Sequence, residues 1–266
     1  MREQRTMTGH SLVRVEHVMG MPISLDLDDD LPIDELERLA DGVFDWLRLV
    51  DRIFSTYKPD SEISRLGRGE LRREDCSPVV GEVLDRCAEL WDETGGYFDI
   101  NVGGRLDPSG YVKGWAVQRA CDQLLEQGSR NHCLNAGGDV FVRGGPHGRQ
   151  RWRVGVRHPW EALAVAWVLE VSDAAVATSG TYERGLHVLN PYTGAPATQL
   201  RSVTVVGPDL GTADAYATAA LAMGLAGIDW LATLQGHESA VVTEDGRALR
   251  SDGLPVVPPK SGGGEG

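Results

Sequence analysis

The stretch TADAYATAALAMG, residues 212–224, follows the strand-like segment Ser202–Val206 and predicts an alanine-rich helix over Thr212–Met223. A strand followed by a helix is the first sign of an α+β chain. Within the helix, Asp214 and Thr218 stand four residues apart, so their oxygens project from the same face. A charged and a neutral oxygen together suit Mg²⁺ when phosphate oxygens and waters complete its octahedron. Spacing alone leaves an alternative open, in which Asp214 favours the helix dipole and Thr218 bonds back to the preceding turn.

Outward from this helix, apolar periodicity predicts further helices and strands. Helical spacing marks Asp34–Phe54, Pro78–Trp91 and Val112–Glu126. Strand-like runs are Leu12–Val18, Ile23–Leu27, His132–Asn135, Asp139–Arg143, Trp152–Arg157, Val165–Val171 and Leu186–Leu189, with a hairpin about Asp245-Gly246. The pattern predicts an α+β fold with mixed and antiparallel strands and packed helices. We expect residues 1–257 to form a single domain, which two intimately packed lobes could build, and residues 258–266 to form a flexible tail.

Composition narrows the class of protein. The chain has 266 residues, of which 41% are hydrophobic, and this is enough for a sizeable core. The formal net charge of −13 argues against nucleic-acid binding, which needs clustered Lys and Arg. We expect no membrane insertion, because no apolar run reaches membrane-spanning or signal-peptide length. The cysteines show no CxxC spacing and are expected to be buried free thiols in a reducing, cytoplasmic compartment: Cys76, Cys87, Cys121 and Cys133.

The segment LDPSGYVKGWAVQRA, residues 106–120, leads a turn into a helix. A helix N-terminus presents unpaired backbone N–H groups, and with Lys113 nearby it could receive a phosphate or another anion. The segment is not a Walker loop, since its Lys113-Gly114 pair is reversed relative to that motif, and no GxGxxG fingerprint follows a predicted strand. An ordinary Asx/Pro turn beside a solvated lysine remains an open alternative.

A third segment, AVATSGTYERGLHVLNPYTGAP at residues 175–196, carries His187 in a strand-like run. Histidine is the side chain best suited to take a proton from a hydroxyl near neutral pH, although a lone histidine is usually structural. The other histidines, such as His132, lie in looser or unpatterned contexts. Ser179 is not predicted to be a hydrolase nucleophile, because TSGTY is not a GxSxG elbow.

Several short motifs also occur in a distinctive order along the chain. They are Met19-Gly20-Met21, FSTYKPDSEISRL at 54–66, GGYFDINVGG at 95–104, Asp107-x-x-Gly110-x-x-Lys113-Gly114, Asn135-x-Gly137-Gly138-Asp139, Ala177–Tyr182, His187–Gly194 and Ala213–Thr218. In this order they resemble the FAD:protein FMN transferases, also called ApbE-type flavin transferases, over most of Met19–Gly224. The resemblance implies the ApbE-like fold.

The resemblance also implies a role for individual residues. It implies that Asp214 and Thr218 bind Mg²⁺ through their side chains, with the backbone carbonyl of Gly110 as a third ligand. The residues implied to line the FAD site are Met19, Tyr57, Tyr97, Phe98, Asp99, Asp107, Lys113 and His187. In such a site an acceptor Thr or Ser hydroxyl of a flavoprotein attacks the phosphorus on the FMN side of FAD while AMP leaves. His187 is the candidate base, and Asp214 is catalytic through the metal.

The chain departs from the family pattern at several points. Asn190 replaces the usual Asp of His-x-x-Asp-Pro, Gln118 replaces an Asp, and Met21 replaces a Thr, so each removes a polar or charged function near the cofactor. The connection between Asp99 and Asp107 is much shorter than the family commonly has. Two alternatives to transfer therefore stay open: an FAD pyrophosphatase that yields FMN and AMP, and a non-catalytic FAD-binding protein.

Overall fold

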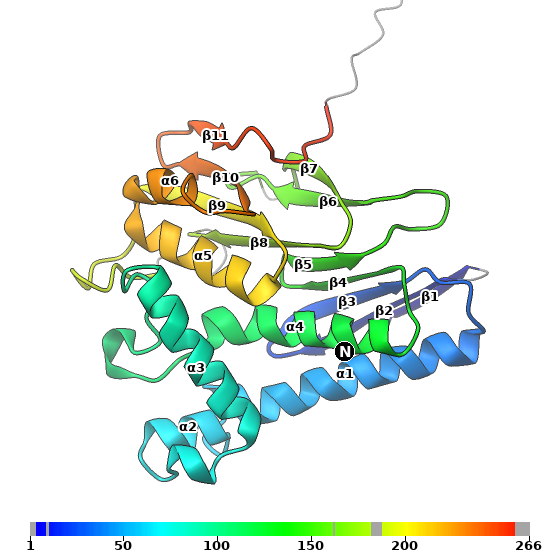
Figure 1. Cartoon of the computed structure of the whole chain (residues 1–266), viewed down its shortest axis with the longest axis horizontal. Helices are drawn as coiled ribbons and strands as arrows, with labels where there is room; N and C mark the ends of the chain where they lie inside the picture. The colour runs from blue at the N-terminus through cyan, green and yellow to red at the C-terminus, as the bar shows by residue number, and fades with distance from the viewer. Residues whose placement is uncertain (1–3, 9–10, 162, 182–187, 259–266) are drawn as a thin grey trace, which may run out of the picture.

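The computed structural model describes residues 4–8, 11–161, 163–181 and 188–258. Within these residues, nine strands form one sheet in the order β1-β2-β3-β4-β5-β8-β9-β10-β11, while β6 and β7 form a separate hairpin (Figure 1). The sheet strands are β1 (Gln4–Thr8), β2 (Ser11–Val18), β3 (Met21–Leu27), β4 (His132–Ala136), β5 (Asp139–Arg143), β8 (Ala174–Gly180), β9 (Leu200–Gly207), β10 (Glu238–Thr243) and β11 (Ala248–Arg250). The hairpin consists of β6 (Trp152–Arg157) and β7 (Val165–Val171). All pairings between these strands are antiparallel, and with the helices they form the predicted α+β fold.

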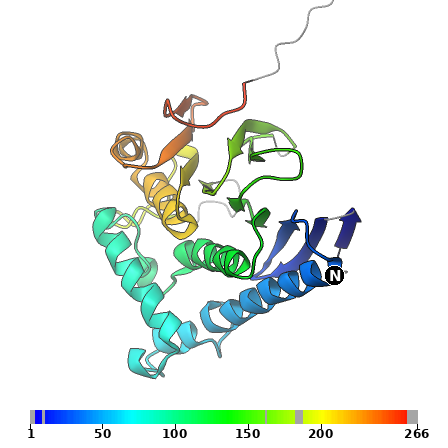
Figure 2. The same ribbon diagram turned by 45° about the vertical axis from the view of Figure 1, so that its right-hand side comes forward.

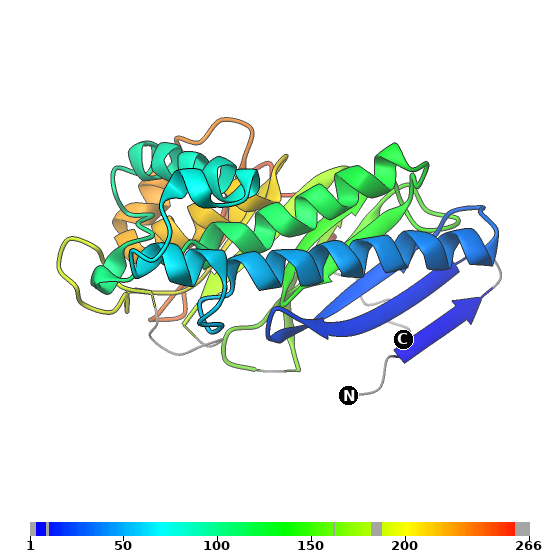
Figure 3. The same ribbon diagram turned by 90° about the horizontal axis from the view of Figure 1, so that it is seen from below.

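Helices cover one face of the large sheet, and the β6–β7 hairpin lies against the other (Figures 2 and 3). The covering helices are α1 (Ile33–Phe54), α4 (Ser109–Glu126) and α5 (Leu210–Met223). Three further helices lie outside this layer: α2 (Glu62–Gly67), α3 (Pro78–Glu93) and α6 (Ala226–Leu231). None of the helices in the described part of the chain is both long and apolar enough to cross a bilayer.

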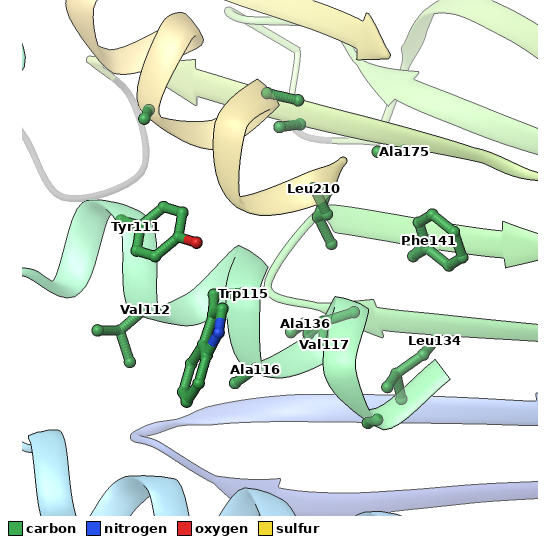
Figure 4. Packing of buried hydrophobic residues seen from close by; sticks show 14 of the residues in the cluster. Tyr111, Val112, Trp115, Ala116, Val117, Leu134, Ala136, Phe141, Ala175 and Leu210 are labelled. Atoms are coloured by element: carbon green, nitrogen blue, oxygen red, sulfur yellow. The ribbon is translucent and has the colours of Figure 1, made fainter. Parts of the chain in front are cut away.

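The alternation of side chains along each strand divides the core into two layers. On the helix side, Leu134, Phe141 and Ala175 of the sheet belong to the same core as Val117 of α4 and Leu210 of α5 (Figure 4). On the opposite side, the buried residues of the sheet and of the hairpin form a second cluster, which includes Val140, Val142, Val176, Trp152, Val154 and Val156.

The helices α4 and α5 cross with their backbones in contact. A Cβ on Gly114 would lie 2.5 Å from the carbonyl oxygen of Leu210, and a Cβ on Gly211 would lie 2.6 Å from the ring of Tyr111. Such separations are far inside van der Waals contact, so only glycine at these positions permits the crossing. The crossing brings Lys113, next to Gly114 on α4, toward Asp214 on α5.

The longer elements match the sequence-based predictions closely. The strands Asp139–Arg143, Trp152–Arg157 and Val165–Val171 have the predicted bounds, and α1 begins one residue before the predicted Asp34. The hairpin about Asp245-Gly246 is confirmed, with Gly246 at φ 87° in the turn. These elements have clear periodicity or an unambiguous turn, which is why sequence alone identifies them.

Other predictions were wrong or incomplete. The helix predicted from Val112 begins at Ser109, because the Pro108 carbonyl already accepts the N–H groups of Tyr111 and Val112 at 3.0 Å. Strand β8 was not predicted, since AAVATSG lacks an alternating pattern. His132, expected in a loose context, is 0% exposed. All four cysteines are free as predicted, but Cys76 and Cys133 are only partly buried. The short elements β1, α2 and α6 were also missed.

Two predictions fall largely on residues outside the described part of the chain. The predicted strand Leu186–Leu189 includes two such residues, and Leu189 itself makes an isolated bridge with Pro196. The predicted tail, residues 258–266, is described only at residue 258.

Candidate functional site

A cavity of about 820 Å³ brings together residues that are far apart in the sequence. Its walls come from the β2–β3 turn, the end of α1, the segment from residue 97 to α4, the end of β8 and the inner face of α5. All the predicted site residues that the structure describes line this cavity: Met19, Tyr57, Tyr97, Phe98, Asp99, Asp107, Gly110, Lys113, Asp214 and Thr218. His187, the predicted base, lies outside the described residues.

The β2–β3 turn places Met19 in the cavity wall in an unusual backbone conformation. Met19 has φ 55° and Gly20 has φ 77°, which is the left-handed geometry of a two-residue hairpin turn. Glycine adopts this conformation freely, whereas a methionine there is strained. Strain of this kind often occurs at binding sites, and here it places Met19 in the cavity wall.

The N-terminal turn of α4 forms the floor. The Asp107 carboxylate accepts the backbone N–H of Ser109 at 3.0 Å, which sets the start of the helix. The ring of Phe98 lies against Gly110, where an added Cβ would come within 3.2 Å of it. Gly110 therefore belongs to the first turn of α4 and not to a turn before it, whereas Lys113 lies within the helix, as predicted.

Lys113 lies between two buried carboxylates. Its Nζ forms an ion pair with Asp139 and lies 3.7 Å from Oδ2 of Asp214. The side chains of Asp139 and Asp214 are 1% and 4% exposed, and that of Lys113 is 18% exposed. Two carboxylates and one ammonium leave this trio with a formal charge of −1 in a poorly solvated place, where charge is costly unless compensated.

Of these three residues, Lys113 and Asp214 were predicted from the sequence to belong to the site, and Asp139 was not. It follows Gly137 and Gly138, whose φ values of 63° and 104° make the tight β4–β5 turn. Its Oδ1 also accepts the backbone N–H of Thr178 at 2.9 Å. The Asn-x-Gly-Gly-Asp motif had been noted as a family signature, but nothing in its spacing shows that Asp139 would meet Lys113.

On α5, Asp214 and Thr218 face the cavity, as their spacing predicted. The capping role belongs to another residue, since the Asp209 side chain accepts the N–H of Thr212 at 2.7 Å. The alternative in which Asp214 serves the helix start is thereby disfavoured. The hydroxyl of Thr218 lies 3.0 Å from that of Ser179 at the end of β8, and Ser179 lines the cavity too.

Aromatic residues surround the cavity mouth. Tyr57 lines the cavity and is 87% exposed, so its ring is accessible from solvent. Tyr97 packs edge-on against Tyr192 with ring centroids 5.0 Å apart, and the Tyr192 hydroxyl donates to the carbonyl of Gly95. An exposed ring at one side and a fixed ring at the other can hold a flat aromatic ligand.

Two departures from the family pattern have structural roles and do not line the cavity. The Asn190 side-chain oxygen accepts the N–H groups of Tyr192 and Thr193, and its amide donates to the Ala222 carbonyl at 3.3 Å. Gln118 accepts the N–H of Leu210 at 3.2 Å and so ties α4 to the start of α5. Neither Asn190 nor Gln118 is among the described residues that line the cavity, whereas Met21 is.

The predicted metal ligands are a carboxylate, a hydroxyl and a backbone carbonyl. The described residues contain no cluster of three or more His, Cys, Asp or Glu side chains that could hold a metal ion. A magnesium site of the predicted type would need only one such side chain, Asp214, because phosphate oxygens and waters usually complete the magnesium shell.

Comparison with known proteins identifies the family and the fold. The model of the ApbE family matches residues 19–107 and 101–242, and the two matches meet where the connection between Asp99 and Asp107 is short. A FAD:protein FMN transferase of Rhodobacter capsulatus is 36% identical over 157 residues, which cover 55% of this chain and 29% of that protein. Another from Vibrio cholerae is 33% identical over 129 residues, which cover 45% of this chain and 39% of that protein. The chain thus spans well under half the length of these relatives.

Solved structures share the fold over nearly the whole chain. The flavin transferase ApbE from Vibrio cholerae superposes with a TM-score of 0.80 at 22% identity and covers 94% of this chain and 98% of that one. The flavinyl transferase ApbE of Pseudomonas stutzeri gives 0.77 at 21% identity, with 95% and 96% covered. Since the family model matches most of the sequence, this chain belongs to the ApbE family.

Proposed function

We propose that the chain transfers FMN from FAD to a Thr or Ser hydroxyl of an acceptor flavoprotein, with release of AMP. The observation that supports this most strongly is the buried trio of Lys113, Asp139 and Asp214 in a cavity of about 820 Å³. A cavity of this size falls within the usual range for organic ligands. The names of the sequence relatives, FAD:protein FMN transferase, point to the same reaction.

The cavity has suitable groups for the flavin ring, the pyrophosphate and the hydroxyls of FAD. Tyr57 and Tyr97 present aromatic faces and edges for the flavin ring at the mouth. Lys113 of α4, which lines the cavity, supplies an ammonium group for the pyrophosphate. Asp99 and Asp107 at the wall can accept hydrogen bonds from ribose or ribityl hydroxyls.

A magnesium ion fits the donors on this wall. The Asp214 carboxylate, the Thr218 hydroxyl and the Gly110 carbonyl are all hard oxygen donors at one cavity, and the trio around Lys113 carries an excess negative charge. When bound there, Mg²⁺ would neutralise pyrophosphate charge and help the leaving phosphate depart.

The residues of the chain would position the reaction, and little covalent chemistry would fall to the protein. The acceptor oxygen forms a bond to the FMN phosphorus while the bond from that phosphorus to the bridging oxygen breaks, so the bridging oxygen leaves with AMP. The proton of the acceptor hydroxyl passes to a base, for which His187 is the candidate on the sequence resemblance. Ion pairing with Asp139 keeps Lys113 directed at the site.

The test is an incubation of the purified chain with FAD, MgCl₂ and a flavoprotein domain that has a flavinylation hydroxyl, read by intact-protein mass spectrometry. Transfer gives an acceptor that is heavier by one FMN, and AMP in equal amount. Free FMN with AMP and an unmodified acceptor would instead indicate a pyrophosphatase. Unchanged FAD that nevertheless binds would indicate a non-catalytic FAD-binding protein.

A matched variant separates the metal role from general binding. Asp214→Asn keeps the size of the side chain and removes its charge, so Mg²⁺-dependent turnover should be lost while the fold is retained. Undiminished turnover by this variant would refute the assignment of Asp214.

The free thiols of all four cysteines agree with a reducing compartment, and we propose the cytoplasm for the reaction.

A further inference from the structure

Strand β6 has a strand partner on one side only. It pairs with β7 along its length, and no other strand in the described ranges joins it. The outer edge of β7 is covered by the segment Pro255–Val257: Glu170 donates to Pro255 at 2.8 Å, and Val257 donates to Val168 at 2.7 Å. The small sheet is thus closed on the β7 side and open on the β6 side.

Strand geometry shows which backbone groups lie on the open edge. Val168 and Glu170 direct their backbone groups at the segment Pro255–Val257, so Leu169 between them faces β6 and exchanges hydrogen bonds with its partner Val154. Arg153 and Gly155, opposite Glu170 and Val168, must then direct their N–H and C=O groups away from β7. Among the described residues, none forms a hydrogen bond with these four backbone groups.

A groove of about 360 Å³ lies along this edge. Its floor is a row of side chains across three strands, because Val15 of β2 is paired with Ser24 of β3, and Ser24 with Asn135 of β4. One wall is the stretch of β6 from Val154 to Arg157, where Gly155 has no side chain to cover its backbone. The β6–β7 hairpin therefore leaves this part of the sheet face uncovered.

The groove runs into the large cavity. Gly137, Arg157 and Thr178 line both, so a chain lying in the groove reaches the candidate site at that junction. An extended strand advances about 3.3 Å per residue, so the wall from Val154 to Arg157 accommodates about four residues. That length is enough to deliver one side chain into the cavity.

From these observations we propose that an extended segment of the acceptor polypeptide binds in the groove as an added strand on β6 and presents its hydroxyl to the large cavity. The inference rests on the proposed transfer to a protein hydroxyl and deepens it. Added strands bind mainly through main-chain hydrogen bonds, which the groups of Arg153 and Gly155 offer. Alternate side chains of the acceptor would face the floor, where Val15 is apolar and Ser24 and Asn135 are polar. Among the described residues that line the groove, only Arg157 at the junction end is charged, so the groove favours a polypeptide over a second nucleotide phosphate.

The first test measures amide hydrogen exchange by NMR, residue by residue, in the FAD-loaded chain. Without acceptor, the amides of Arg153 and Gly155 should exchange rapidly, whereas those of Val154 and Val156, bonded to β7, should exchange slowly. Addition of a flavoprotein domain that the wild-type chain flavinylates should slow Arg153 and Gly155 at least tenfold. Acceptor binding that leaves both rates unchanged would overturn the proposal.

The second test fills the groove. Val15→Trp places an indole over the floor and should raise the KM for the acceptor at least tenfold, with FAD affinity unchanged. Val13→Trp is the matched control, since Val13 lies on the same face of β2, two residues away, and does not line the groove. Equal acceptor KM values for the two variants would refute the groove. If the wild-type chain modifies no acceptor at all, the proposed transfer itself fails, which is a different result.

Discussion

The α4–α5 crossing leads to a prediction with a calculable size. In Gly114→Ala the added Cβ would lie 2.5 Å from the Leu210 carbonyl oxygen and 2.8 Å from Cα of Gly211, so the two helices must move apart by several tenths of an ångström. Both close atoms belong to the backbone, so no side-chain rotation can relieve the contact. Overpacking of this kind costs about 1–3 kcal/mol, and the crossing belongs at the upper end.

Helix propensity acts in the opposite direction. Replacing glycine by alanine inside a helix stabilises it by about 1 kcal/mol. The net loss for Gly114→Ala is then about 2 kcal/mol, which corresponds to roughly 4–8 °C in Tm for a chain of this size. Gly42→Ala is the matched control: Gly42 lies in α1, is exposed, and has no atom within 4 Å of its added Cβ. That variant should gain up to about 1 kcal/mol.

The assay is urea unfolding of both variants and the wild type, followed by far-UV circular dichroism, together with FAD titration. Because the crossing brings Lys113 and Asp214 together, Gly114→Ala should also weaken FAD binding, and Gly42→Ala should not. If Gly114→Ala were as stable as Gly42→Ala, the backbone contact between α4 and α5 would be refuted. Loss of stability without any loss of FAD affinity would show that the crossing does not position the site.

The remaining predictions concern buried charge. Lys113→Ala removes the ammonium that pairs with the buried carboxylates of Asp139 and Asp214, and it should cost about 3 kcal/mol of unfolding free energy in the same urea assay; an unchanged midpoint would contradict the ion pairs. Asp29 accepts the Ser129 hydroxyl at 2.5 Å and the N–H groups of Arg130 and Asn131, so Asp29→Ala should lose about 3 kcal/mol, and a Tm shift under 2 °C would argue against this. Burial lowers the pKa of His132 from 6.5 to about 4. Between these two pH values His132 is protonated in the unfolded chain and neutral in the folded chain, so acid favours unfolding. The free energy of unfolding should therefore fall by up to about 3 kcal/mol between pH 6.5 and pH 4. Burial, with Asp28 nearby, raises the pKa of Asp26 to about 6. As the pH falls, Asp26 is therefore protonated in the folded chain before it is protonated in the unfolded chain, which stabilises the fold and opposes the effect of His132. Asp26→Asn should therefore make the free energy of unfolding fall more steeply as the pH is lowered. If urea titrations at several pH values gave the same pH dependence for this variant and the wild type, the stabilising role of Asp26 protonation would be refuted.

Clear periodicity made much of the fold predictable. The helix Ile33–Phe54 and the strands Trp152–Arg157 and Val165–Val171 repeat apolar residues at the spacing of their own structure, so local sequence identifies them. Strand β8 does not, because it is buried on both faces and uses small residues that carry no alternation. The start of α4 was misplaced because Pro108 and Ser109 look like a turn and are also good first residues of a helix.

The candidate site was partly predictable for a different reason. Asp214 and Thr218 share a helix face at a spacing of four residues, which depends on the helix alone. The ion pair between Lys113 and Asp139 depends on the β4–β5 turn, the close crossing of α4 over α5 and the order of strands in the sheet. No local pattern contains that information.

The amino-acid sequence by itself determined the helical and strand segments, the oxygen pair on α5 and the resemblance to the ApbE family, because each of these depends on residues close together or on ordered motifs. The tertiary structure decided which charges meet at Lys113, that Asn190 and Gln118 support turns and helices away from the cavity, and that β6 leaves an open edge beside the site. These features arise from contacts between segments separated by tens of residues, and only the packing of helices and hairpin on the sheet brings those segments together.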